Sequence, residues 1–219
     1  MLRTMEPRPT SVGSRLPVAG RVAAAAATGI ITYLLIDAAL RVLEPQYSLL
    51  RNAESDYTNG PYAWLMDLNF LLRGGFSLAV VAAIASLVPR RGVVTAGLAL
   101  MAVWAVGSGL LAFFPDDLAG HAVTTAGRLH LVLALIAFVA VAIGAAVLAY
   151  GLLQERAWRP VAPWLVGLAV AGLVALPLVG RPLIRADIGL FERLFLGLEL
   201  AWLLVAAAWG VRVSRRPAT

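Results

Sequence analysis

Residues 129–153 read LHLVLALIAFVAVAIGAAVLAYGLL, an apolar stretch that carries no Asp, Glu, Lys or Arg. About 20 apolar residues cross the hydrocarbon core of a bilayer as a helix, so this stretch predicts a membrane-spanning helix. Polar and apolar residues do not alternate along it, which excludes a strand of a transmembrane barrel. Because backbone groups in lipid must be satisfied within the segment, the chain has to cross the membrane as helices.

The composition of the whole chain agrees with this interpretation. Of its 219 residues, 61% are hydrophobic and 14% are charged, whereas soluble domains have roughly 45–50% apolar and about 25% charged residues. The chain has no cysteine, which excludes disulfides, thiolate metal sites and cysteine nucleophiles. The formal net charge is +6, but the arginines lie between apolar runs rather than along a basic face, so we expect no nucleic-acid partner.

Six stretches are long and apolar enough to span a bilayer. They are Val22–Leu43, Tyr62–Val88, Val93–Phe114, Leu129–Leu153, Val161–Val179 and Ile188–Val211. The connections between them are short, which favours antiparallel neighbours. The sequence therefore predicts an all-α integral membrane protein, a six-transmembrane-helix up-and-down bundle.

Arginine is distributed unevenly between the two sides of this predicted bundle. The side that carries both termini has the larger set, which is Arg3, Arg8, Arg15, Arg21, Arg90, Arg91, Arg156, Arg159, Arg212, Arg215 and Arg216. The opposite side has Arg41, Arg51, Arg128, Arg181 and Arg185. Cytoplasmic loops carry the excess of basic residues, so both termini are expected in the cytoplasm. Residues 1–21 are then a disordered basic cytoplasmic tail, 22–211 the transmembrane domain and 212–219 a second basic tail.

Both histidines and nearly all the carboxylates lie on the predicted extracytoplasmic side. Carboxylates beside a histidine act as general acid and base, and the candidate catalytic residues are Glu54, Asp56, Asp117, His130 and Glu192. Candidate substrate-binding residues are Arg51, Asn69 and Arg193, with the arginines suited to hold a phosphate or another anion.

Other interpretations of the same residues stay open. The acidic residues before the second span are also typical of a solvated turn, and Asp117 of a cap on the fourth span. A metal held by Asp56, Asp117, His121 and His130 has weak support, since no HExxH motif occurs, and we expect neither metal nor cofactor. A hydrolase built on Ser55 and His130 lacks a G-x-S-x-G context.

Two charges fall near the middle of predicted spans. Arg73 and Glu199 lie equally far along the chain from the outer ends of their spans, about 17 Å deep at 1.5 Å per residue. An unpaired charge at this depth is costly. We therefore expect an intramembrane pair between Arg73 and Glu199.

Several segments resemble one known family. They are YSLLRNAESDY (47–57), GPYAWLMDLNFLLRG (60–74), FPDD (114–117), the histidine at 130 and GLFERLF (189–195). In this order and spacing they resemble the bacterial membrane family called domain of unknown function 998, over Gln46 to Trp209. The resemblance implies six spans in a bacterial plasma membrane and no settled activity. The positions that match its polar motif are Ser55, Asp56, Asn69, Pro115, Asp117 and His130.

Three classes of function remain open at this point. The first is an enzyme with an acid and histidine site at the extracytoplasmic face, acting on a lipid-like or isoprenoid substrate. The second is a non-catalytic subunit that assembles with another membrane protein. The third is a small transporter with a charged path through the membrane. Membrane lipids are the expected partners in the first class.

Overall fold

The computed structural model describes residues 16–179 and 187–216 of the chain. Its long helices are α1 (Leu16–Leu43), α2 (Ala63–Leu87), α3 (Gly92–Leu110), α4 (Thr125–Leu153), α5 (Ala162–Val179) and α6 (Ile188–Ser214). Two short 3-10 helices, η1 (Glu54–Asn59) and η2 (Leu111–Phe113), lie in connections, and no strand occurs within the described ranges. The six long helices, with η2 extending α3, are long and apolar enough to cross a membrane. The predicted all-helical, multi-pass fold is confirmed.

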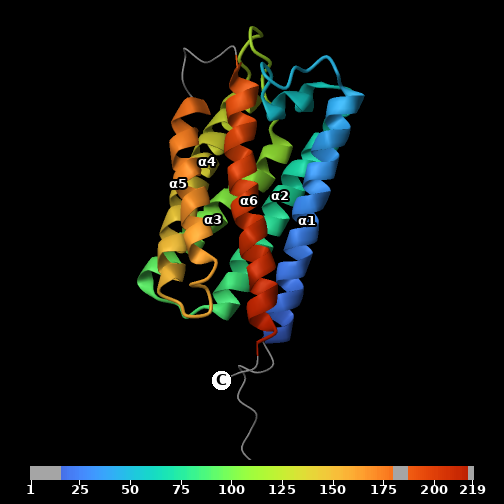
Figure 1. Ribbon diagram of the computed structural model, residues 1–219. Coiled ribbons are helices and arrows are strands. Elements are labelled where there is room, and N and C mark those ends of the chain that lie inside the picture. Colours follow the sequence, from blue (N-terminus) through green and yellow to red (C-terminus); the bar gives the residue numbers. More distant parts are fainter. Residues whose placement is uncertain (1–15, 180–186, 217–219) are drawn as a thin grey trace, which may run out of the picture.

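The helices form a closed bundle (Figure 1). Each packs against the next in the chain, and α6 completes the ring by packing against α1 while also contacting α2. The start of α1 and the end of α6 lie at one end of the bundle (Figure 1). We call the other end the mouth; it is formed by residues 44–62, residues 111–124 and the first turn of α6.

Two helix ends extend beyond the predicted spans. Helix α1 begins at Leu16 rather than Val22, and α6 continues to Ser214, so the boundaries expected for the two tails move outward. The two extensions pack on each other, because a Cβ at Gly20 would lie 2.1 Å from Ser214 Oγ. This contact between distant residues stabilises turns that the polar sequence at each terminus did not predict.

Helix α4 also begins earlier than the expected Leu129. Its N-cap is Thr124, whose side-chain oxygen accepts a hydrogen bond from Gly127 N at 3.0 Å. A threonine in this position satisfies one of the free N–H groups of the first turn. The cap therefore sets the start of α4 at Thr125 although Arg128 follows within its first turn.

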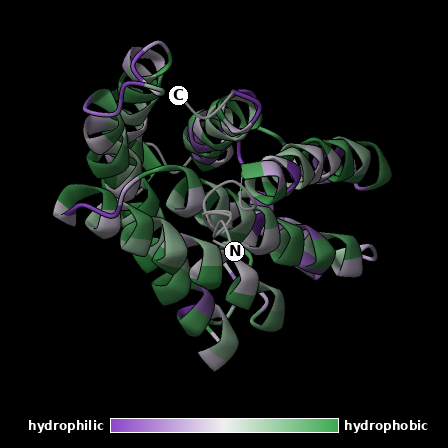
Figure 2. Ribbon diagram, turned by 90° about the horizontal axis from the view of Figure 1, so that it is seen from below, coloured by the Kyte–Doolittle hydropathy of each residue, from purple (hydrophilic) through white to green (hydrophobic). Residues whose placement is uncertain are grey.

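Most residues of the helices are hydrophobic (Figure 2), and many large apolar side chains, such as Leu35 and Trp164, are exposed on the outside of the bundle. The core between the helices includes Trp104, Trp158 and Trp202, all fully buried. Small residues let neighbouring backbones approach closely; a Cβ at Gly97 of α3 would lie only 2.8 Å from the backbone of Leu148 in α4. The helices therefore pack tightly with lipid-facing side chains outside.

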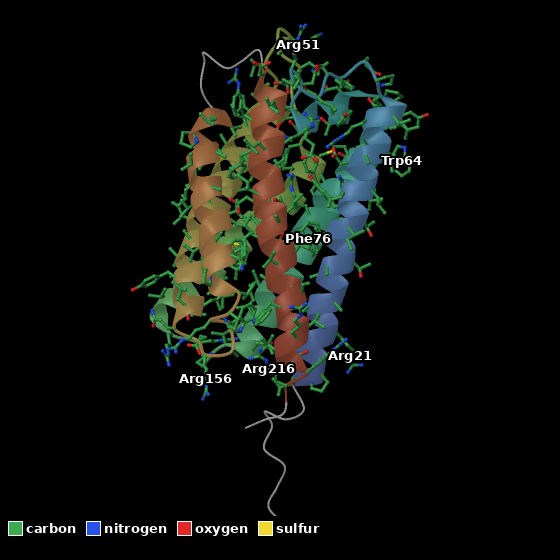
Figure 3. All side chains as sticks on the ribbon, in the orientation of Figure 1. Arg21, Arg51, Trp64, Phe76, Arg156 and Arg216 are labelled. Carbon is green, nitrogen blue, oxygen red and sulfur yellow. The ribbon has the colours of Figure 1, made fainter. Side chains whose placement is uncertain are left out.

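The labelled arginines in Figure 3 separate into two groups. Arg21, Arg156 and Arg216 lie at the end with the termini, and Arg51 lies at the mouth (Figure 3). This arrangement brings the arginine-rich connections to one end of the bundle. With the positive-inside rule it predicts that the mouth is extracytoplasmic.

Candidate functional site

The loop between α1 and α2 folds into the mouth instead of extending into solvent. Its buried residues are Glu44 and the first five residues of η1, which are Glu54, Ser55, Asp56, Tyr57 and Thr58. Arg193 of α6 holds the loop, because its Nη1 donates hydrogen bonds to the carbonyl oxygens of Leu49 at 3.1 Å and Asn52 at 2.6 Å. The interpretation of the η1 residues as a solvated turn is therefore wrong.

The same loop lies directly against the first turn of α6. Leu190 N donates a hydrogen bond to Leu50 O at 3.2 Å, which satisfies one of the free N–H groups of the helix. A Cβ at Gly189 would lie 2.1 Å from Asn52 O, so only glycine allows this approach. The loop and α6 therefore form one packed unit.

Glu54 joins three helices inside this unit. Its carboxylate accepts a hydrogen bond from the Tyr33 hydroxyl of α1, and its Oε2 lies 3.5 Å from Arg73 Nη1 of α2. Its backbone N–H donates to Glu192 Oε2 of α6 at 2.9 Å. Burial and the nearby Asp37 raise the pKa of the Glu54 carboxyl, and Arg73 opposes this shift. The network fixes the position of Glu192.

The expected pair of Arg73 with Glu199 is wrong. Arg73 lies beside Glu54, with its guanidinium 5.0 Å from the ring centroid of Phe70. Glu199 packs against α5 instead, where a Cβ at Gly172 would lie 2.4 Å from its Oε1. Neither oxygen of Glu199 has a hydrogen-bond partner among the described residues. Equal depth does not bring two side chains together when they face different neighbours.

A cavity of about 510 Å³ lies beside this network. Its polar end is formed by Ser55, Arg73, Asp116, His130 and Glu192. Apolar side chains of α4 and α5 form the rest, including Leu131, Leu135, Val139, Leu176 and Val179. Leu131 and Leu135 are also 68% and 61% exposed on the outer face of α4. The cavity therefore connects a buried polar cluster with the lipid-facing surface.

His130 has a defined tautomer in its neutral form. Its Nδ1 lies 2.6 Å from the carbonyl oxygen of Phe114. Because a carbonyl oxygen only accepts hydrogen bonds, Nδ1 carries the proton and Nε2 keeps its lone pair. No partner of Nε2 occurs among the described hydrogen bonds, and His130 lines the cavity. This geometry makes Nε2 a proton acceptor at the polar end.

Ser55 and Asp116 form a second polar pair at the cavity. Ser55 Oγ donates a hydrogen bond to Asp116 Oδ2 at 2.6 Å. Ser55 makes no hydrogen bond to His130 in the described part of the chain, so the arrangement expected for a Ser–His hydrolase is not formed. Asp116 was missed as a site residue, although the FPDD segment contains it. Tyr33 was also missed, since an isolated tyrosine within a span gives no sequence signal.

Asp117 and Asp56 do not line the cavity. Asp117 accepts hydrogen bonds from Thr124 N and Thr124 Oγ1, each 2.8 Å long, and so holds the N-cap of α4. This is the capping role that the sequence left open. Asp56 is buried in η1 and accepts a hydrogen bond from Asn52 Nδ2 at 2.7 Å. Burial raises the pKa of the Asp56 carboxyl, and Asp116 adds to the shift.

The three residues expected to bind substrate have separate locations. Arg51 is exposed at the mouth (Figure 3). Asn69 is fully buried in α2, and neither atom of its amide has a hydrogen-bond partner within the described ranges. Arg193 holds the loop carbonyls. In the described segments no three His, Asp or Glu side chains are close enough to hold a metal ion.

Comparison with known proteins agrees with the resemblance seen in the sequence. The profile of the family described as "Protein of unknown function (DUF998)" matches residues 22–209, which is most of the chain. No curated protein and no solved structure shows a significant match. The matched region runs from α1 to α6 and includes every residue of the cavity. The chain is therefore a member of the DUF998 family.

Proposed function

We propose that the protein is an enzyme of the bacterial plasma membrane that acts on a lipid-like or isoprenoid amphiphile at the extracytoplasmic face. The substrate enters from the lipid phase beside α4, its apolar chain occupies the cavity, and its polar head lies at the end formed by His130 and Glu192. Membrane lipids are then the molecules from which the substrate is drawn.

The cavity is the observation that carries this proposal. Ligand sites are typically apolar concavities of about 300–1,000 Å³ with a few convergent polar groups, and this one of about 510 Å³ has that composition. Its walls include Leu135 and Leu176, and its polar groups come from η1, α2, α4, α6 and the connection before α4. Polar and ionisable side chains buried in a membrane bundle are costly, so a group of them beside an apolar cavity favours a functional role over a purely structural one.

Proton transfer is the chemistry that the polar end supports. His130 Nε2 accepts a proton, since its Nδ1–H is directed at the Phe114 carbonyl. Glu192 is held by the backbone N–H of Glu54 and lines the same cavity. A histidine with a positioned carboxyl is a general acid–base arrangement. The reaction we infer is therefore proton abstraction from, or donation to, the head of the bound amphiphile.

A transporter is less well supported by the same geometry. A path through the bundle requires polar side chains that continue beyond the cavity. Glu199 is the next ionisable residue of α6 after Arg193, yet it packs against α5 and does not line the cavity. The ionisable side chains that line the cavity therefore do not continue along α6 to Glu199.

The proposal is tested by filling the cavity and identifying what the protein carries. Ala134 of α4 lines the cavity, so Ala134→Trp should displace a bound amphiphile. Val132→Trp on the exposed face of the same helix is the matched control. Organic extracts of the purified proteins are compared by mass spectrometry. We expect an amphiphile with wild type and Val132→Trp, depleted about tenfold in Ala134→Trp.

The second arm of the test follows the chemistry in cells. Membrane lipids of a deletion strain are compared after complementation with each variant. A lipid that accumulates with Ala134→Trp and returns to its normal level with Val132→Trp is the expected substrate. Equal extracts from the two purified variants, together with unchanged lipids in the deletion strain, contradict the proposed function.

A further inference from the structure

The polar end of the cavity carries an excess of acidic groups. Three carboxyl groups lie at or directly behind it, those of Glu54, Asp116 and Glu192. Among the described residues two guanidinium groups are near them: Arg73 lines the cavity, and Arg193 holds the loop behind it. Arg73 is opposed by Glu54 at 3.5 Å. No Lys or Arg side chain of the described residues lies within 4.0 Å of Asp116 or Glu192. When the three carboxyls are ionised, their negative charge exceeds the positive charge of these two guanidinium groups.

The hydrogen-bonding groups left free have the same character. In the neutral form of His130, Nε2 is an acceptor, because Nδ1 carries the proton. Glu192 lines the cavity and uses Oε2 for the Glu54 N–H, and its other oxygen makes no hydrogen bond among the described residues. Arg73 is the exception: its Nη1 donates to Tyr33 and lies beside Glu54, while its Nε has no hydrogen-bond partner among the described residues. The polar end of the cavity therefore favours a head group that donates hydrogen bonds.

We infer that the amphiphile has an uncharged or cationic donor head group, a hydroxyl or an amine, and not a phosphate. A phosphate brings negative charge and only acceptor oxygens at neutral pH. In a site with low dielectric constant its repulsion by Glu192 and Asp116 is strong. A hydroxyl or ammonium group instead donates to His130 Nε2 and Glu192. This inference rests on the proposed function, and it reverses the expectation from sequence that arginines hold an anion here.

The experiment uses three probes with one chain length: tetradecylamine, tetradecan-1-ol and tetradecyl phosphate. The chain has no cysteine, so Ala134→Cys reports on the cavity and Val132→Cys on the lipid-facing side of α4. The rate of maleimide labelling is measured on purified protein in neutral nanodiscs at pH 7.5. We expect the amine and the alcohol to slow labelling at Ala134→Cys only. The phosphate should require about tenfold more probe.

Glu192→Gln separates the charge effect from chain binding. In the Ala134→Cys background it should weaken protection by the amine about tenfold, and that by the alcohol less than threefold. Equal protection by all three probes, or best protection by the phosphate, overturns the head-group inference and leaves the proposed amphiphile site standing. Failure of every probe to slow labelling at Ala134→Cys overturns the amphiphile site itself.

Discussion

The Arg73 guanidinium lies 3.5 Å from Glu54 Oε2, and both side chains are almost fully buried, with 2% and 4% exposure. The Tyr33 hydroxyl bridges them, since it donates to Glu54 and accepts from Arg73 Nη1 at 3.2 Å. A buried charge without a partner is strongly unfavourable, whereas a compensated pair is tolerated. This contact therefore couples the folding of the α1–α2 loop to the position of α2.

Removing one partner of this pair should destabilise the protein more than removing both. Arg73→Leu leaves the Glu54 carboxyl buried without its cation and should cost about 3–5 kcal/mol. Arg73→Leu with Glu54→Leu should recover a large part of that loss. Unfolding of the purified variants in detergent, followed by circular dichroism, measures the coupling.

Arg73→Leu with Glu199→Leu is the control for this cycle. The two residues do not pair, so their effects should add to within about 0.5 kcal/mol. If this double variant recovers stability and the double variant of Arg73→Leu with Glu54→Leu does not, the pairing of Arg73 with Glu54 is incorrect.

Gly60 should be intolerant of a side chain because of Glu44. The Glu44 carboxylate accepts a hydrogen bond from Tyr62 N at 2.9 Å at the start of α2, and a Cβ at Gly60 would lie 1.6 Å from Glu44 Oε2. Gly60→Ala therefore displaces a fully buried carboxylate and should cost roughly 1–3 kcal/mol.

Gly75→Ala is the matched change within α2. None of the described residues has an atom within 4 Å of a Cβ at Gly75, and alanine favours a helix over glycine by about 1 kcal/mol. We therefore expect its melting temperature to equal or exceed that of wild type. A melting temperature for Gly60→Ala as high as that of Gly75→Ala speaks against the role given to Glu44.

Asp56 should make the protein more stable at low pH than at neutral pH. Burial raises the pKa of its carboxyl in the folded protein, and Asp116 adds to the shift. A carboxyl whose pKa is raised by folding stabilises the folded protein at pH values below the ordinary pKa of the group. This stabilisation is lost as the pH rises through the pKa that the group has in the folded protein. Asp56→Asn keeps an acceptor for Asn52 without the charge.

The measurement is the melting temperature of both proteins between pH 4 and pH 7. Asp56→Asn should melt higher than wild type at pH 7, and the difference should shrink toward pH 4. A wild-type advantage that grows with pH requires instead that the ionised carboxylate stabilises the fold.

Cysteine labelling determines the orientation of the bundle. Val123 at the mouth and Gly92 at the opposite end are both exposed. The chain has no cysteine of its own, so each substitution introduces a single thiol. The arginine distribution predicts an extracytoplasmic mouth. An impermeant maleimide applied to intact cells should label Val123→Cys and should label Gly92→Cys only after lysis. The reverse pattern moves the cavity to the cytoplasmic half of the membrane.

The spans were predictable and the contacts among their polar groups were not. A long apolar run such as residues 129–153 has one physical solution in a bilayer, so the helices follow from the sequence. Depth along α2 and α6 is also set by chain position. The face that Arg73 or Glu199 presents depends on packing between helices, and the burial of Glu54 depends on a loop held by Arg193 far along the chain. Such contacts leave no local pattern.

His130 provides a test that separates catalysis from structure. The asparagine of His130→Asn can place its amide N–H near the position of Nδ1 and keep the hydrogen bond to the Phe114 carbonyl, but it has no basic nitrogen at Nε2. His130→Phe removes both functions. If His130 transfers protons, His130→Asn should retain abundance and melting temperature and should lose the activity that restores normal lipids in the deletion strain. His130→Phe should lose stability as well, because the Phe114 carbonyl is left without its donor. Full complementation by His130→Asn shows that the imidazole only supports the Phe114 segment, and the catalytic base must then be sought in Glu192.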